Sequence, residues 1–95
     1  MPDWDAYQAH VMGVRIHELY DGSTYAEAHP LWDTYPPVDC YGVYVRDKEG
    51  YAYHVADYDT PELAIAARRV VTDLCHQRYT YRDILNYMSS EVNHA

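Results

Sequence analysis

Apolar residues in the last third of the chain recur at helical spacing and predict a helix from about residue 61 to 77. Thr60 is a suitable N-cap for it, and Pro61 fits the first helical position. The predicted apolar stripe of this helix is Leu63, Ala66, Ala67, Val70, Val71 and Leu74.

A second helix is predicted over about residues 81–91. Thr80 and Asp83 have the spacing of a capping box, which marks the start of a helix. The predicted buried face is Tyr81, Ile84, Leu85 and Met88.

Before these helices, two runs with period-two alternation predict a β-hairpin over residues 41–46 and 51–56. Asp47 and Gly50 fit the first and last positions of a type I turn with a glycine bulge. The resulting register predicts the facing pairs Val45–Tyr53, Val43–Val55, Tyr44–His54, Arg46–Ala52 and Tyr41–Asp57. The face with Val43 and Val45 is apolar, so we expect it to pack on Leu63, Val70 and Leu74 of the first helix.

The N-terminal third permits two interpretations. A helix capped by Asp3 or Asp5 could run to about Tyr20. Alternatively, that helix breaks at Gly13, and a third strand runs from there to Tyr20. Its apolar residues form two stripes, which both interpretations accommodate.

A further capping box, Thr24 and Glu27, predicts a short helix that Pro30 ends, and residues 31–39 are expected to form a loop. Together these elements predict an α+β fold in one domain over residues 1–95. In it, a hairpin packs against N-terminal and C-terminal helices, and a third strand beside the hairpin is the alternative.

The chain begins without a signal peptide, and its longest apolar run, residues 63–67, is too short for a membrane span. We therefore expect a cytoplasmic protein that does not enter a membrane. Cys40 and Cys75 are too few for a disulfide scaffold. Reduced thiols are the expectation, and one disulfide between them is the alternative.

Composition then indicates the kind of partner. The chain has 12 tyrosines, no phenylalanine and a net charge of −8. Tyrosine combines an apolar body with a polar tip and is enriched at protein interfaces. The acidic excess favours a basic partner and disfavours direct nucleic-acid binding, which needs a basic surface.

Candidate chemistry is sparse. His10 and His17 are too far apart along the chain to share an ion, and Cys40, Cys75 and the other histidines lack metal-binding spacing. We expect no metal and no cofactor. There is no nucleophile motif, so an enzyme is disfavoured, and the best acid–base candidate is His54 beside Tyr44.

The remaining signal is a set of acidic and tyrosine residues around the base of the hairpin. The predicted partner-binding residues are Asp33, Tyr35, Asp39, Tyr41, Asp57, Tyr58 and Asp59. Carboxylates on a surface can imitate a phosphate backbone, and tyrosines beside them can supply contact area. The alternative is that the acids only keep a small domain soluble.

In size, acidity and lack of catalytic motifs, the chain resembles the small acidic proteins by which phages block host nucleic-acid machinery, such as anti-CRISPR proteins. The resemblance assigns no residues. It implies a non-catalytic inhibitor that occupies a basic nucleic-acid-binding surface, with imitation of DNA as one way of doing so. A small homodimeric accessory protein is the second hypothesis, and a minimal enzyme centred on His54 is the third.

Overall fold

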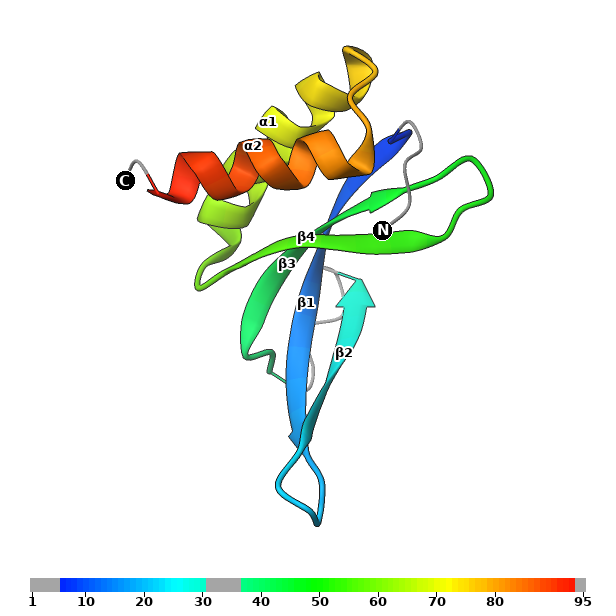
Figure 1. Ribbon diagram of the computed structural model, residues 1–95. Coiled ribbons are helices and arrows are strands. Elements are labelled where there is room, and N and C mark those ends of the chain that lie inside the picture. Colours follow the sequence, from blue (N-terminus) through cyan, green and yellow to red (C-terminus); the bar gives the residue numbers. More distant parts are fainter. Residues whose placement is uncertain (1–5, 31–36, 94–95) are drawn as a thin grey trace.

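One long strand, β1 (Gln8–Glu18), organises the sheet in the computed structural model, which describes residues 6–30 and 37–93 (Figure 1). The other strands are β2 (Thr24–Pro30), β3 (Cys40–Arg46) and β4 (Ala52–Tyr58), followed by helices α1 (Pro61–His76) and α2 (Tyr81–Asn93). The four strands form an antiparallel sheet in the order β2-β1-β3-β4. The predicted α+β class is confirmed.

The N-terminal helix predicted to reach Tyr20 is wrong, because this segment is β1. Residues 8–14 pair with β3 and residues 12–18 pair with β2, so both edges of the strand find backbone partners. The alternative of a third strand was right in kind, but the strand begins before Gly13 instead of after it. Local sequence could not decide this, since the stabilising hydrogen bonds come from residues distant along the chain.

The short helix predicted from Thr24 is also wrong, because these residues form β2. The Glu27 carboxylate does not cap a helix start. It contacts Arg15 and His17 of the neighbouring strand. Pairing with β1 has overridden the local capping signal.

The hairpin of β3 and β4 has the predicted turn. Gly50 has a φ of +92°, and its N–H donates to the Asp47 carbonyl at 3.1 Å. The predicted pairs Val45–Tyr53, Tyr44–His54 and Arg46–Ala52 are confirmed. Beyond Tyr44, however, Val55 is an extra residue in β4, forming a β-bulge. Val43 therefore faces Ala56 and Tyr41 faces Tyr58, so the predicted pairs Val43–Val55 and Tyr41–Asp57 are wrong.

Both helices begin as their caps predict. The Thr60 hydroxyl accepts a hydrogen bond from the Leu63 N–H, with Pro61 at the first turn. In α2, Thr80 and Asp83 bond each other's backbone N–H groups, as a capping box requires. The predicted buried residues of α2 are confirmed, with Tyr81, Ile84 and Met88 buried and Leu85 partly buried.

The face that α1 turns to the sheet differs from the predicted one. The buried residues of α1 are Ala64, Ala67, Val71, Leu74 and Cys75. They pack in one core with Val43 and Val45, whereas Leu63 and Val70 are 54% and 37% exposed. Leu63 and Val70 are therefore not the core contacts that were predicted. The small side chains of Ala64 and Ala67 allow the helix backbone to approach the sheet closely.

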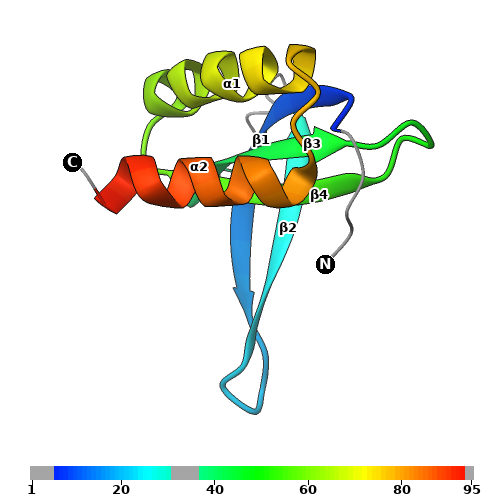
Figure 2. The same cartoon turned by 45° about the horizontal axis from the view of Figure 1, so that its top comes forward.

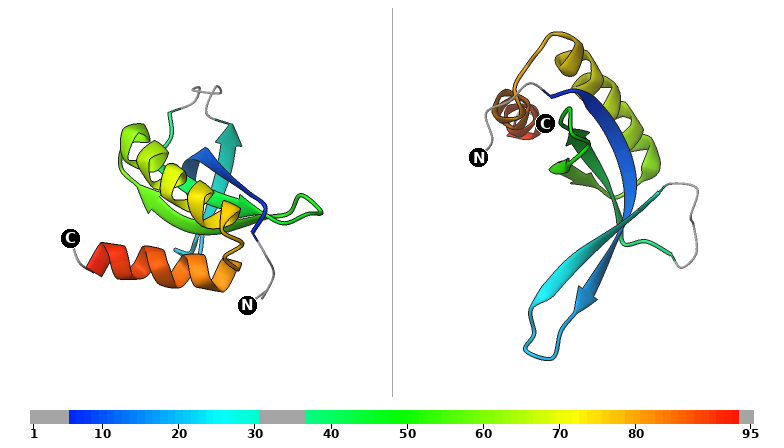
Figure 3. Two further views of the ribbon diagram at one scale, coloured as in Figure 1. Left: turned by 90° about the horizontal axis from the view of Figure 1, so that it is seen from above. Right: turned by 90° about the vertical axis from the view of Figure 1, so that its right-hand side faces the viewer.

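The second half of the β1–β2 pair projects away from both helices (Figures 2 and 3). We call residues 15–28 the arm. β3 pairs with β1 only as far as Val14, so the arm is a two-stranded ribbon beyond the sheet body. Of the two helices described here, neither is long and apolar enough to cross a membrane.

The buried face of α1 can be tested with two neighbouring valines. We expect Val71→Ala to lower the free energy of unfolding by roughly 2 kcal/mol, because it leaves a cavity in the core. We expect Val70→Ala to cost less than about 0.5 kcal/mol, because Val70 is a surface position. Urea denaturation followed by circular dichroism measures both. Equal losses at the two positions would contradict this orientation of α1.

Candidate partner-binding surface

The sheet has one face under α1 and one face that no described helix covers. Alternation along the strands places Val14, Gly42 and Tyr44 on the side opposite the helix-packed core. A Cβ atom added at Gly42 would lie 2.8 Å from the Tyr44 ring and 3.0 Å from an Asp57 carboxylate oxygen. We call Val14, Gly42, Tyr44, His54 and Asp57 the open face, of which His54 and Asp57 are exposed, Tyr44 is half-buried, and Val14 and Gly42 are buried. Glycine at position 42 leaves the space in which the Tyr44 ring and Asp57 approach each other.

The bulge in β4 gives the open face its polar pair. In a regular strand, residues three apart point to opposite faces of the sheet. The extra residue, Val55, shifts the alternation, so His54 and Asp57 lie on the same face. The His54 ring nitrogen Nε2 is 2.9 Å from the Asp57 carboxylate, and the ring makes an edge contact with Tyr44 at 5.4 Å between centroids.

Three of the predicted acids come together around Cys40. The pKa of the Cys40 thiol is raised first by burial and then by the negative charges of Asp57, Asp39 and Asp59. All three aspartates are exposed. We call Asp39, Asp57 and Asp59 the acidic patch. Asp39 thus joins Asp57 and Asp59, which lie 18 and 20 positions later in sequence, in one negatively charged surface at the end of β3 and β4.

Asp39 also has a structural task at this place. Its N–H donates to the Val14 carbonyl at 2.7 Å, and its carboxylate accepts the Ile16 N–H at 2.6 Å. β3 pairs with β1 no further than Val14, so this carboxylate satisfies the next free N–H along the β1 edge. Asp39 therefore joins the arm to the acidic patch.

The two described tyrosines of the predicted partner-binding set do not lie beside the acidic patch. Tyr41 and Tyr58 face each other across the strands and pack against the helix-side core, so they lie away from Asp57. The tyrosine beside the acidic patch is Tyr44, and its pKa is raised by burial and by the charge of Asp57. Asp33 and Tyr35 lie outside the described residues. The sequence correctly predicted Tyr44 opposite His54, but it did not place Asp57 beside them because it did not anticipate the bulge.

Nucleophilic chemistry fits this surface poorly. A reactive cysteine needs a lowered pKa, which positive neighbours provide, whereas Cys40 has carboxylates around it and a raised pKa. Cys75 is buried in the core, its pKa is also raised, and both thiols are free. Among the described residues, no three ligating side chains are placed to hold a metal ion. The arrangement is suited to attracting cationic groups.

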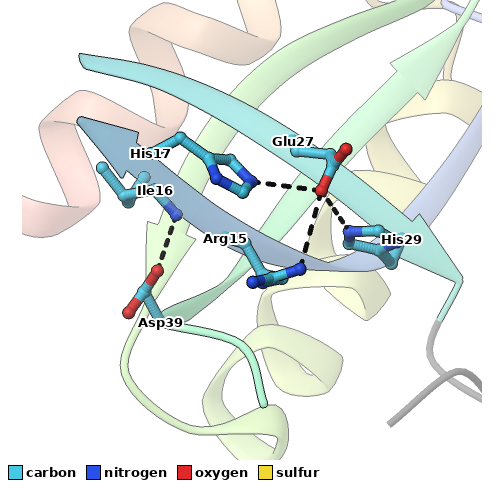
Figure 4. Close-up of polar contacts among 6 residues, drawn as sticks. All are labelled: Arg15, Ile16, His17, Glu27, His29 and Asp39. Carbon is cyan, nitrogen blue, oxygen red and sulfur yellow. Dashed lines mark hydrogen bonds and ion pairs between the residues drawn. The ribbon is translucent and has the colours of Figure 1, made fainter. Parts of the chain in front are cut away.

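The arm carries a second polar cluster that sequence reasoning missed (Figure 4). One Glu27 carboxylate oxygen lies 2.8 Å from His29 Nε2, 3.2 Å from His17 Nε2 and 3.9 Å from an Arg15 guanidinium nitrogen. The His17 ring also stacks on Tyr25 with 4.8 Å between centroids. Polar residues alternate along the sequence at positions 15 and 17 and at 25, 27 and 29, which is typical of one face of a strand. The helices predicted for these two segments hid that pattern.

No family model, no curated protein and no solved structure matches the chain. The fold and the surface therefore define the class of protein on their own: an α+β domain with an open, acidic sheet face and a projecting arm.

Alkylation of Cys40 tests the acidic patch. Replacing Asp57 with Asn removes a negative charge that raises the thiol pKa. The rate of iodoacetamide modification at pH 8 should then rise about two- to threefold. Glu62→Gln is the matched control, because Glu62 is exposed but is not among the charges that act on Cys40. Peptide mass spectrometry separates Cys40 from Cys75. Equal rates in both variants would contradict the clustering of these acids.

Titration of Glu27 tests the arm cluster. The pKa of Glu27 is lowered chiefly by the hydrogen bond from His29 and then by that from His17. Because the folded-state pKa is depressed, the stabilisation is present above the unfolded-state pKa and is lost as pH falls through the folded-state pKa. We expect His29→Ala to raise the pKa more than His17→Ala, as measured by carboxylate ¹³C NMR. An unchanged Glu27 pKa in both variants would show that the cluster does not form.

Proposed function

We propose that the chain is a non-catalytic binding protein that inhibits a nucleic-acid-handling protein by occupying its basic surface. The observation that carries the proposal is the acidic patch on a sheet face that no described helix covers. A surface that binds nucleic acid is positively charged, and an acidic, aromatic-bearing surface complements it. The net charge of −8 adds long-range attraction toward such a partner.

The acidic patch and Tyr44 have different parts in this proposal. Asp57 and Asp59 are exposed and would meet lysines or arginines that otherwise contact phosphates. Tyr44 is half-buried, so its ring is held in place and could anchor the complex at low entropic cost. An origin in a phage or mobile element, an anti-CRISPR-like target and a cytoplasmic location belong to the proposal and rest on the resemblance in size and charge.

A homodimeric accessory protein is the second candidate, and the outer edge of β2 favours it. β2 pairs only with β1, and no described strand lies on its other side. The arm also exposes Ile16, Leu19, Tyr20 and Tyr25. By contrast, the Tyr81 hydroxyl donates to the His54 carbonyl of the other edge strand at 2.6 Å, which partly blocks strand addition there. Sedimentation at several concentrations distinguishes this candidate, because the inhibitor proposal needs only a monomer.

Charge reversal tests the inhibitor proposal. Immobilised protein captures partners from nuclease-treated lysate of the source cells, and mass spectrometry identifies them. We expect Asp57→Lys combined with Asp59→Lys to slow association with the partner by about tenfold or more, as electrostatic steering predicts. Tyr44→Ala should instead speed dissociation.

The matched control is Glu49→Lys combined with Asp73→Lys, which makes the same change in net charge at exposed positions outside the acidic patch. It should alter association far less. The inhibitor proposal also requires that the chain displace labelled nucleic acid from the purified partner. A partner that binds nucleic acid equally well in its presence would refute inhibition. Unchanged association of the patch variant would refute the assigned surface.

A further inference from the structure

A cavity of about 510 Å³ lies at the edge of β1 where β2 ends. β2 pairs with β1 only from Met12 onward, and its last residue is Pro30. Before Met12, β1 therefore has a strand neighbour only on the β3 side, and α1 contributes to the wall on the other side. The described lining residues are His10, Val11, Met12, Pro30, Arg46, Ile65 and Arg68.

Two arginines line this cavity from different elements, Arg46 from β3 and Arg68 from α1. One guanidinium nitrogen of Arg46 donates to the Gly50 carbonyl at 2.6 Å, and its other N–H groups are the ones that a ligand would use. Both lie near His10, since their positive charges add to burial in lowering its pKa. Neither arginine forms an ion pair with any described acid, although the chain has 15 acidic and 7 basic residues. Two cations that line one cavity repel one another, and an anion between them would relieve that repulsion.

His10 provides a second, independent sign of a missing partner. Its Nε2 atom is buried and has no hydrogen-bond partner among the described residues. A buried polar atom without a partner is costly, so such atoms commonly face a ligand or an ordered water. The other lining residues, Val11, Met12, Pro30 and Ile65, are apolar and suit a hydrocarbon or aromatic group.

We propose that this cavity binds a small organic anion, with its carboxylate or phosphate group at Arg46 and Arg68 and its apolar part against Val11 and Ile65. The guanidinium fork matches both head groups in geometry and charge. The volume falls within the range of small-molecule sites. The negative net charge of the protein does not forbid this, because charges more than about 10 Å away are largely screened at 0.1 M salt. The proposal is independent of the acidic patch, which attracts cations.

Binding can be measured by NMR titration of the ¹⁵N-labelled full chain. The probes are phenyl phosphate, benzoate and the neutral analogue benzamide. We expect saturable shifts at the amides of His10, Val11 and Arg68 with at least one of the two anions, and the tighter anion identifies the preferred head group. Benzamide should bind at least about tenfold more weakly, because it lacks the charge-assisted bonds. No saturable shift with either anion, or equal binding of benzamide, would overturn the proposal.

Two neighbouring arginines give a matched pair of variants. Arg68→Gln should weaken anion binding about tenfold, because one charged fork is lost. Arg69→Gln changes the net charge equally at a residue that is exposed like Arg68 but does not line the cavity, so affinity should stay within about twofold. If both variants weakened anion binding equally, the loss would reflect the change in net charge alone, and the proposed site would be refuted. Arg46→Gln provides a second test from β3 if Arg68→Gln unfolds the domain.

Discussion

The staggered pairing of β1 is the constraint on which the rest of the structure depends. Its first half pairs with β3, its second half pairs with β2, and only Met12 to Val14 have a neighbour on both sides. Backbone groups must find partners, so this stagger divides the molecule into a three-stranded body and a two-stranded arm. At the junction of body and arm, where β3 no longer pairs with β1, the Asp39 carboxylate accepts the hydrogen bond of the Ile16 N–H. The cavity lined by Pro30 lies beside the first half of β1, which has β3 on one side but does not pair with β2 on the other.

A single inserted residue has a comparable effect on the surface. Without Val55 as a bulge, His54 and Asp57 would point to opposite faces, and the open face would lose its polar pair. The shift also turns Tyr58 toward the core and leaves Tyr44 beside the acidic patch. The composition of the candidate surface is thus a consequence of backbone geometry as much as of residue choice.

Charge is segregated on this small domain. Carboxylates gather around Cys40, whereas two of the seven basic residues gather at the cavity lined by His10. Each group shifts the pKa of a neighbour in the direction its sign requires: the acids raise that of Cys40, and the arginines lower that of His10. The two functions that we propose, binding a basic partner and binding a small anion, therefore rest on separate groups of residues.

The sequence by itself determined the elements whose signals are local. Thr60 with Pro61 and Thr80 with Asp83 mark the two helix starts, and Asp47 with Gly50 marks the tight turn. The acids at 39, 57 and 59 were also recognised as a group, because the hairpin brings its two ends together. In these cases the stabilising contact lies within a few residues or across one predictable turn.

Only the tertiary structure decided the rest. The β1 segment has apolar residues that suit either a helix or a strand, and pairing with β2 and β3 settled it. The sequence predicted that Leu63 and Val70 of α1 face the core, whereas α1 packs on the sheet through Ala64 and leaves both of them exposed. Three features depend on residues from separate elements: the bulge at Val55, the cavity lined by Arg46 and Arg68, and the Glu27 cluster. Non-local hydrogen bonds and packing set these features, and a single sequence read locally does not contain them.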